Sequence, residues 1–364
     1  MSPDPEPVLK SRRRADVDTT VVAVRDVRFG DGSYPVVAGP VAVEDEQQIT
    51  TIADAAAEAG ASVLRAGTFR AETSPYTFKG LGAEGLWLLE KAGHEAHLPT
   101  MTEVIEPGHV DLVADHVDVL EVGPDNMQNF VLLQAAGRTG RPVLIHRAAA
   151  ATVDEWLMAA EYVLAEGNER VVLCERGSRT FDPRTSDTID ISVVPVVQRL
   201  SHLPVIIDPA PTAGVSDILR PLALAGRSAG ADGLIVSVHP DPDTAIAGNG
   251  NQLGLTDFAQ LMEALGIPSL RDEIDRIDRH LIRLVADRLK GSVEIARIKS
   301  ARGIPLRSPL REAELVAEAR ELAVRHDVDP DYVEALMTMI LDHSRAAQRD
   351  AVGGSEASAA EAGS

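Results

Sequence analysis

Residues 142–177 read PVLIHRAAAATVDEWLMAAEYVLAEGNERVVLCERG, and this stretch decides the fold. Two short β-rich runs, PVLIHRA (142–148) and RVVLCERG (170–177), flank the segment 153–169, whose apolar residues recur at helical spacing. A strand, a helix and a second strand in this order are typical of parallel β/α units. The stretch therefore predicts an α/β domain built on a parallel sheet.

The same alternation extends over residues 35–240. Six further runs have the character of buried strands: PVVAGP (35–40), SVLRAG (62–67), LPTMTEV (98–104), VDVLEVG (117–123), LPVIIDPAP (203–211) and GLIVSVHP (233–240). Eight β/α units in about 210 residues favour a (β/α)8 TIM barrel, whose active site would lie at the C-terminal ends of the strands. A doubly wound open sheet is the competing fold. It usually has a glycine-rich phosphate turn after its first strand, and VVAGPVAVE (36–44) has none.

An all-helical domain is expected after the barrel. SLRDEIDRIDRHLIRLVADRLKGSVEIARIKSARG (269–303) has the apolar spacing of one long amphipathic helix, and Gly303 and Pro305 end it. A second helix is expected to begin near Pro309 and a third to extend from Pro330 to Gln348. A first helix of about 45 Å cannot bury its apolar face within so small a bundle. We therefore expect this domain to dimerise.

The predicted fold class is thus α/β plus all-α, a TIM barrel followed by a three-helix domain. The predicted bounds are 1–24 for a flexible N-terminal arm, 25–262 for the barrel, 263–350 for the helical domain and 351–364 for a disordered tail.

Composition narrows the classes of partner and compartment. The 364 residues carry a net charge of −21, which argues against nucleic acid and anionic membranes as partners. No apolar stretch approaches the length of a membrane span, and the first twenty residues lack the apolar run of a signal peptide. The single cysteine, Cys174, excludes an intramolecular disulfide and reads as a buried strand thiol. We predict a cytoplasmic protein.

Polar residues of the helical domain have a spacing that suits a small dianion. Arg288 and Lys299 are eleven residues apart, which returns them to nearly the same helix face. Arg271 lies about 25 Å before Arg288 along the axis and about 100° away, so it would have to serve a second subunit's site. Ser344 and Gln348, at i and i+4, share a face of the last helix. Any single arginine here would more simply be a surface charge.

The joint register of these residues, with Ser308, Arg311 and Glu312, resembles the all-helical chorismate mutases over residues 268–350. The resemblance implies a Claisen rearrangement of chorismate to prephenate that needs no metal or cofactor. It also implies a homodimer through the helical domain. We further expect that the barrel could join two such dimers into a tetramer. By this resemblance the catalytic residues are Lys299, Gln348, Arg288 and Glu312. The substrate-binding residues would be Arg271, Ser308, Arg311 and Ser344.

The barrel resembles the 3-deoxy-D-arabino-heptulosonate 7-phosphate (DAHP) synthases of the short bacterial type over residues 25–255. The similar motifs are TSPYTFKGLG, TEVIEP, NMQNF, DEWLMAAEY, AEGNERVVLCERGSRTF, LSHLPVIIDP and AGADGLIVSVHPDP. That family condenses phosphoenolpyruvate with erythrose 4-phosphate on a divalent metal. The resemblance places Val41, Pro211, Ser237 and Gly248 at the four metal positions, and none of these is a good ligand.

The anion-binding positions differ as well. By the resemblance, the family's phosphate-binding loop corresponds to Arg70-Ala71-Glu72. A basic residue of the family is replaced by Asp125 and a lysine by His146, whereas Arg176 is the same in both. From these substitutions we expect a barrel without a metal and without DAHP synthase activity, which supports or regulates the mutase. There are three alternatives. The pocket could have been repurposed for another ligand. The chain could instead be a bifunctional DAHP synthase and chorismate mutase, or a non-catalytic regulatory partner of an active DAHP synthase.

Overall fold

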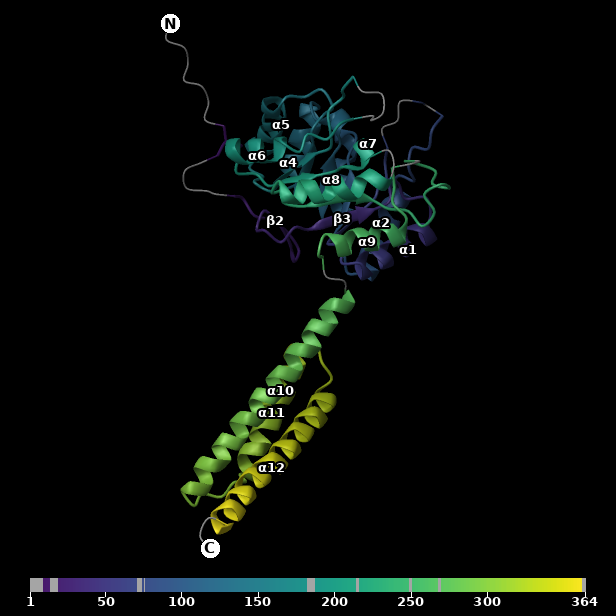
Figure 1. Cartoon of the computed structure of the whole chain (residues 1–364). Helices are drawn as coiled ribbons and strands as arrows, with labels where there is room; N and C mark the ends of the chain where they lie inside the picture. Colours follow the sequence, from purple (N-terminus) through teal and green to yellow (C-terminus); the bar gives the residue numbers. More distant parts are fainter. Residues whose placement is uncertain are drawn as a thin grey trace. The chain divides into compact units, whose positions relative to one another are not determined.

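The computed structural model describes the backbone of residues 9–13, 19–70, 74, 76–181, 187–213, 216–248, 251–267 and 270–361. Within the helices, the side chains of 212–213, 216–217, 270–273, 275–277, 279–280 and 352–361 lie outside the description. The chain divides into two compact units near Arg271. The first is an α/β unit and the second is all-helical (Figure 1).

The first unit is a closed barrel of eight parallel strands in the order β10-β3-β4-β5-β6-β7-β8-β9. Each of the eight predicted runs contains one strand, so the predicted barrel is confirmed. The strands are β3 (Val36–Gly39), β4 (Val63–Arg65), β5 (Thr100–Glu103), β6 (Val119–Val122), β7 (Val143–His146), β8 (Val171–Glu175), β9 (Val205–Ile207) and β10 (Leu234–Ser237).

Helices pack around the strands and bury the barrel's outer face. They are α1 (Glu46–Glu58), α2 (Ala83–Glu95), α3 (Val110–His116), α4 (Phe130–Arg138), α5 (Val153–Ala165), α6 (Val193–Leu200), α7 (Ala210–Ala213), α8 (Ser216–Ser228) and α9 (Leu255–Ala264). Two short 3-10 turns, η1 (Pro107–His109) and η2 (Pro124–Asn126), follow β5 and β6. In α5 a capping box between Thr152 and Glu155 starts the helix, and buried Trp156 donates from Nε1 to the carbonyl of Ile145 at 3.0 Å. Helix α5 is therefore fixed against strand β7, in the β/α unit that the stretch 142–177 predicts.

A β-hairpin that the sequence patterns did not reveal covers the N-terminal end of the barrel. Its strands, β1 (Val22–Val24) and β2 (Val27–Phe29), pair antiparallel outside the barrel sheet. The buried side chains of Val22, Val24 and Phe29 pack against the first residues of the barrel strands. Arg25, at the turn, pairs with Asp118 just before β6 at 2.9 Å. The hairpin closes this end with apolar side chains.

The predicted N-terminal arm, 1–24, is described only in part, and its described residues are bonded to the barrel. The backbone N–H groups of Lys10 and Ser11 each donate to the Glu161 carboxylate at 2.8 Å. The Ser201 hydroxyl donates to the Ser11 carbonyl at 2.6 Å. This part of the arm is therefore held along α5 and α6.

The second unit consists of α10 (Leu270–Ala301), α11 (Pro309–Arg325) and α12 (Pro330–Glu361). The three predicted helices are confirmed. The third one continues beyond Gln348 into the segment expected to be a disordered tail, where alanines favour helix. Arg320 of α11 pairs with Asp331 at 2.7 Å and with Glu334 at 2.5 Å, which ties α11 to the start of α12. Over the described parts of both units, the helices lack the length combined with apolar character that crossing a membrane requires.

Candidate active sites in the barrel and the helical domain

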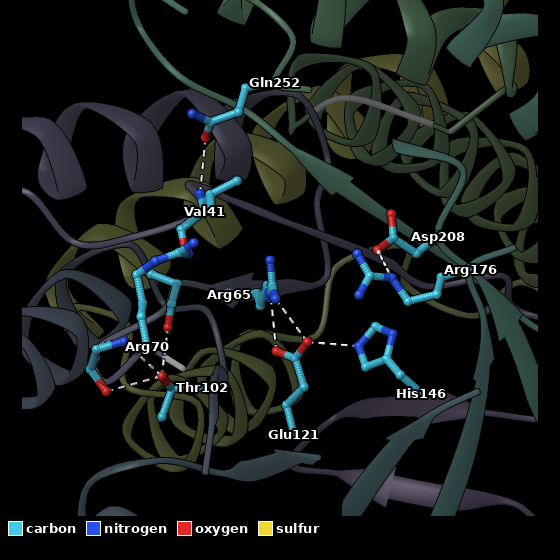
Figure 2. A network of polar contacts seen from close by, with 11 residues as sticks. Val41, Arg65, Arg70, Thr102, Glu121, His146, Arg176, Asp208 and Gln252 are labelled. Carbon is cyan, nitrogen blue, oxygen red and sulfur yellow. Dashed lines mark hydrogen bonds and ion pairs between the residues drawn. The ribbon is translucent and has the colours of Figure 1, made fainter. Parts of the chain in front are cut away.

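A cavity of about 260 Å³ lies at the C-terminal ends of the barrel strands. This is the end at which TIM barrels hold their active sites, because the loops after the strands supply variable side chains. Its charged and titratable lining residues come from six different strands or the turns after them: Arg65, Arg70, Glu103, Glu121, Asp125, His146, Arg176 and Asp208. Figure 2 shows most of them around one space.

Three buried side chains form a connected group that we call the buried triad: Arg65, Glu121 and His146. Arg65 donates twice to Glu121, from Nε and Nη2, each at 2.8 Å. The Oε1 oxygen that accepts from Arg65 Nη2 also lies 2.7 Å from His146 Nε2. Burial alone would raise the pKa of Glu121, but the charge of Arg65 and the contacts with His146 hold it far below its ordinary value. Burial would likewise lower the pKa of Arg65, and Glu121 raises it instead.

Glu103, at the end of β5, has a carboxyl group whose pKa is raised to near neutral pH. Burial, followed by repulsion from Glu121, raises its pKa from 4.5 to about 7. The positive charges of Arg65, Arg176 and Arg70 act in the opposite direction but do not prevail. A half-buried carboxyl with a raised pKa in a cleft is a candidate acid or base.

The raised pKa of Glu103 predicts a specific pH dependence of stability. Because the folded state holds this proton more tightly than the unfolded chain, stability falls as pH rises from about 4.5 to about 7 and the loss is complete above it. Glu103→Gln, which stays neutral, should therefore be more stable than the parent at pH 8 by on the order of 1–3 kcal/mol. At pH 4.5 and below the difference should largely vanish.

Urea unfolding at the two pH values measures this effect. Both tryptophans of the chain, Trp87 and Trp156, lie in the barrel unit, so their fluorescence follows its unfolding. A difference between variant and parent that is equal at both pH values would contradict the assignment.

The four positions aligned with a metal site do line this cavity, but they do not fit a metal. Val41 and Pro211 offer hydrocarbon, Gly248 offers no side chain, and Ser237 offers one hydroxyl. A Cβ at Gly248 would come within 2.5 Å of Val41 Cγ2, so the valine occupies the space in which a side chain from 248 would begin. Among the described residues, no group of three or more His, Cys, Asp and Glu is arranged to hold a metal ion.

The remaining predicted barrel positions are placed as follows. Arg70 lines the cavity and donates from Nη1 to the Val41 carbonyl at 3.1 Å. Arg176 faces Asp208 at 3.9 Å. Asp125 lies in η2 at the exposed rim, and Glu72 lies outside the described residues. All predicted barrel positions within the described residues therefore line this one cavity.

In the helical unit, four of the predicted residues link α10 to α12 or to the loop after α10. Arg288 donates from Nη1 to the Ser344 hydroxyl at 2.8 Å, although the residues lie on different helices. Gln348 donates to the Ser292 carbonyl at 3.1 Å. Lys299 donates to the Leu306 carbonyl at 3.3 Å. The structure therefore brings Arg288, Ser344 and Gln348 to the facing sides of α10 and α12.

Two arginines missed at the sequence level surround Glu312. Its carboxylate lies 3.3 Å from Arg345 Nη1 and 3.5 Å from Arg307 Nε. Both arginines also line a cavity of about 480 Å³ with Gln348 and Arg349. The sequence carried a signal, because Arg345 directly follows Ser344 and Arg307 directly precedes Ser308.

The other predicted residues of this unit lie apart from those contacts. Arg311 is exposed and pairs with Glu314 at 2.9 Å, one turn along α11. Ser308 is the exposed N-cap of α11 and makes no capping hydrogen bond from its side chain. Arg271 stands in the first turn of α10, and its side chain is outside the described residues.

Comparison with known proteins identifies both units. Residues 14–267 match the DAHP synthetase I family, and residues 270–349 match chorismate mutase type II. A phospho-2-dehydro-3-deoxyheptonate aldolase of Thermotoga maritima is 38% identical over 248 residues, which cover 68% of this chain and 73% of the relative. A 2-dehydro-3-deoxyphosphooctonate aldolase of Syntrophotalea carbinolica is 31% identical over 265 residues, covering 68% and 95%. The crystal structure of the Thermotoga maritima DAHP synthase superimposes with a TM-score of 0.69 at 37% identity, covering 71% of this chain and 76% of that one.

These matches correct the expectation that the barrel lacks DAHP synthase activity and only supports or regulates the mutase. That expectation rests on a handful of cavity positions, whereas the family match extends over residues 14–267. The relative that is 38% identical is itself a DAHP synthase, and its fold is reproduced here. The chain belongs to the DAHP synthetase I family, with a chorismate mutase type II domain fused behind the barrel.

Proposed function

We propose that the chain is a bifunctional enzyme, a DAHP synthase in its barrel and a chorismate mutase in its helical domain. The observation that carries the proposal is the pair of family matches, which together extend over residues 14–267 and 270–349. The two activities stand in separate units, each with its own group of cationic side chains.

The proposed mutase reaction needs positioning and electrostatic stabilisation rather than a nucleophile. Chorismate must be held in a compact conformation, and negative charge must be stabilised on the ether oxygen as the C–O bond breaks. Arg288, fixed by Ser344 at 2.8 Å, would hold a carboxylate. Lys299 and Gln348 would donate to the ether oxygen, and Glu312 and Ser308 would hold the ring hydroxyl. Arg345 and Arg307 keep the Glu312 carboxylate oriented.

A second copy of the chain would complete this site. Arg271 and Arg288 are separated along α10 by about 25 Å, so one small ligand cannot reach both on the same helix. On α10 the apolar side chains of Ile274, Leu281 and Leu284 are about half exposed in the single chain. They recur at seven- and three-residue steps, the spacing with which helices pair. We therefore propose a homodimer through the helical domain, in which Arg271 serves the partner's site.

In the barrel the proposed reaction is the condensation of phosphoenolpyruvate with erythrose 4-phosphate. Both substrates are anionic, and Arg70 and Arg176 at the cavity offer guanidinium groups that suit phosphate and carboxylate. Glu103, with a pKa of about 7, can take up or release a proton beside them. Since the residues at the metal positions do not fit a metal, no step is assigned to one.

The two activities can be measured separately on the purified full-length chain. We expect prephenate to form from chorismate, and DAHP to form from phosphoenolpyruvate and erythrose 4-phosphate. Each assay should be run with EDTA and with added Mn²⁺. Absence of DAHP under both conditions would overturn the synthase half of the proposal. Absence of chorismate consumption would overturn the mutase half.

A further inference from the structure

His146, a member of the buried triad, is bonded through only one of its two ring nitrogens. Its Nε2 lies 2.7 Å from Glu121 Oε1 (Figure 2). Its Nδ1 is buried and has no hydrogen-bond partner among the described residues. The side chain is 2% exposed, and it lines the barrel cavity. Buried polar atoms are normally satisfied, so an unsatisfied ring nitrogen at a cavity wall marks a place for a ligand atom or a water molecule.

The contact with Glu121 determines which ring nitrogen carries the hydrogen. Glu121 accepts two hydrogen bonds from Arg65, each at 2.8 Å. Although burial acts to raise the pKa of Glu121, the charge of Arg65 holds it far below its ordinary value. The group is therefore a carboxylate, which can only accept, and Nε2 must donate to it. In a neutral imidazole the second nitrogen is then an acceptor, and here that nitrogen is Nδ1.

The charges of the cavity favour a neutral imidazole. The charged or titratable groups that line it besides His146 are Arg65, Arg70, Arg176, Glu103, Glu121, Asp125 and Asp208. The Glu121 carboxylate is already balanced by Arg65, and Asp208 faces Arg176 at 3.9 Å. A buried imidazolium would need a counter-charge beyond these two pairs. The triad therefore leaves the lone pair of Nδ1 unused.

The proposed synthase reaction has a use for such an acceptor. Phosphoenolpyruvate and erythrose 4-phosphate each carry a phosphate, whereas DAHP, which contains all their carbons, carries a single one. Each turnover therefore releases a phosphate and consumes a water molecule. Of the two hydrogens of that water, one ends on the hydroxyl formed from the aldehyde and the other on the released phosphate. A base that takes a proton from the water makes its oxygen a better nucleophile.

We propose that His146 is a proton acceptor of the barrel cavity, whose Nδ1 takes a proton from a water molecule, and that Glu121 positions it. The O–H bond of the water breaks and the proton passes to Nδ1. The electron pair stays on the oxygen, which bonds to the carbon that loses phosphate. The imidazolium then returns the proton to the phosphate.

The inference rests on the proposed synthase function and adds a residue to it. The family resemblance places a lysine at this position, and a lysine ammonium has donors but no acceptor. The proton-accepting role is therefore a property of this chain's histidine.

Nitrogen-15 NMR of the full-length chain with labelled histidine tests the state of the ring. The signals of His146 are those that disappear in His146→Gln. At pH 8 we expect a protonated Nε2 and an unprotonated Nδ1. A protonated Nδ1 at this pH, in the other tautomer or in an imidazolium, would overturn the proposal.

Chemical rescue tests the use of the ring. His146→Ala should lower kcat for DAHP formation by about 10²–10⁴, the usual contribution of a general base, and added imidazole should restore about tenfold or more of it. A purely structural role would not respond to imidazole. An unchanged kcat, or a loss that imidazole does not restore in a variant with parental tryptophan fluorescence, would overturn the proposal.

His116→Ala is the matched control. His116 lies in α3, is 31% exposed and meets Glu90 at 2.6 Å, so it is also a histidine beside a glutamate, but outside the cavity. Its kcat should stay within about twofold of the parent and should not respond to imidazole. Equal losses in the two alanine variants would contradict a specific role for His146.

The outcomes separate this inference from the proposed function. DAHP formation by the parent, combined with a protonated Nδ1 or with no rescue, would overturn the inference and keep the function. No DAHP formation by the parent would overturn the synthase function, and the NMR signals of His146 would then decide whether its Nδ1 is a proton acceptor.

Discussion

Replacing Arg288 with alanine is expected to lower kcat/KM for chorismate by about 10²–10³, the usual cost of losing one electrostatic donor to a transition state. Arg288 is half-buried on α10 and its guanidinium is held by the Ser344 hydroxyl of α12 at 2.8 Å. This contact fixes the charge before the substrate arrives, so no reorganisation is needed during the reaction. Steady-state consumption of chorismate, followed by absorbance, gives kcat and KM separately.

The matched control is Arg297→Ala. Arg297 lies on the same helix, is 64% exposed and pairs with Glu294 one turn away at 3.6 Å. This variant should keep kcat/KM within about twofold of the parent, because exposed ion pairs of this kind contribute little. Equal losses in both variants would indicate a general effect of charge on the helix and would contradict a specific role for Arg288. Unchanged barrel fluorescence would show that the first unit is not affected.

Replacing Glu121 with alanine is expected to destabilise the barrel by about 3–5 kcal/mol, because it leaves a buried arginine without its counter-charge. Arg65 is 15% exposed and Glu121 is 1% exposed, so water would compensate poorly for the lost carboxylate. The variant also removes the acceptor that His146 Nε2 meets at 2.7 Å. Urea unfolding followed by tryptophan fluorescence reports this loss, since both tryptophans are in the barrel unit.

Two further variants test the physical cause. Glu90→Ala removes the carboxylate of a surface pair with His116, where both side chains are at least 31% exposed, and should cost under about 1 kcal/mol. The double variant Arg65→Met with Glu121→Leu removes both buried charges together. It should recover a large part of the stability lost in Glu121→Ala, because replacing a whole buried pair by apolar side chains is often nearly neutral. Failure of the double variant to recover any stability would point to lost packing rather than to an unpaired charge.

The barrel could be predicted from the sequence because each strand has its own β-rich run. A fully buried parallel strand is largely a continuous apolar segment, as in residues 143–145 of β7, and the helix after it has a different period. The hairpin escaped prediction for the opposite reason. The turn between its strands holds Arg25 with a positive φ of 52°, and an arginine in a sequence does not indicate this conformation.

The site could be predicted only where spacing along one helix or one strand carries the information. The i and i+4 relation of Ser344 and Gln348 places them correctly on one face of α12, and both contact α10. The pairing of Arg65 with Glu121 is different. These residues stand on β4 and β6, 56 positions apart, and meet because alternate strands of a barrel direct side chains into the same interior layer. No local sequence pattern predicts this contact between Arg65 and Glu121.

The expectation of an inactive barrel was wrong because it, too, was based on single sequence positions. It judged single positions by residue type, Val41 and Pro211 against a metal site and Glu72 and Asp125 against an anion site, whereas the family match extends over residues 14–267.

The hairpin at the N-terminal end of the barrel has a kinetic consequence. With Val22, Val24 and Phe29 closing that end, molecules reach the cavity through the mouth formed by the loops after the strands. Product must leave by the route through which substrate enters. In the proposed synthase reaction, a product retained in the cavity would exclude the next substrate, so we expect product inhibition to be competitive with a substrate that binds in the same place.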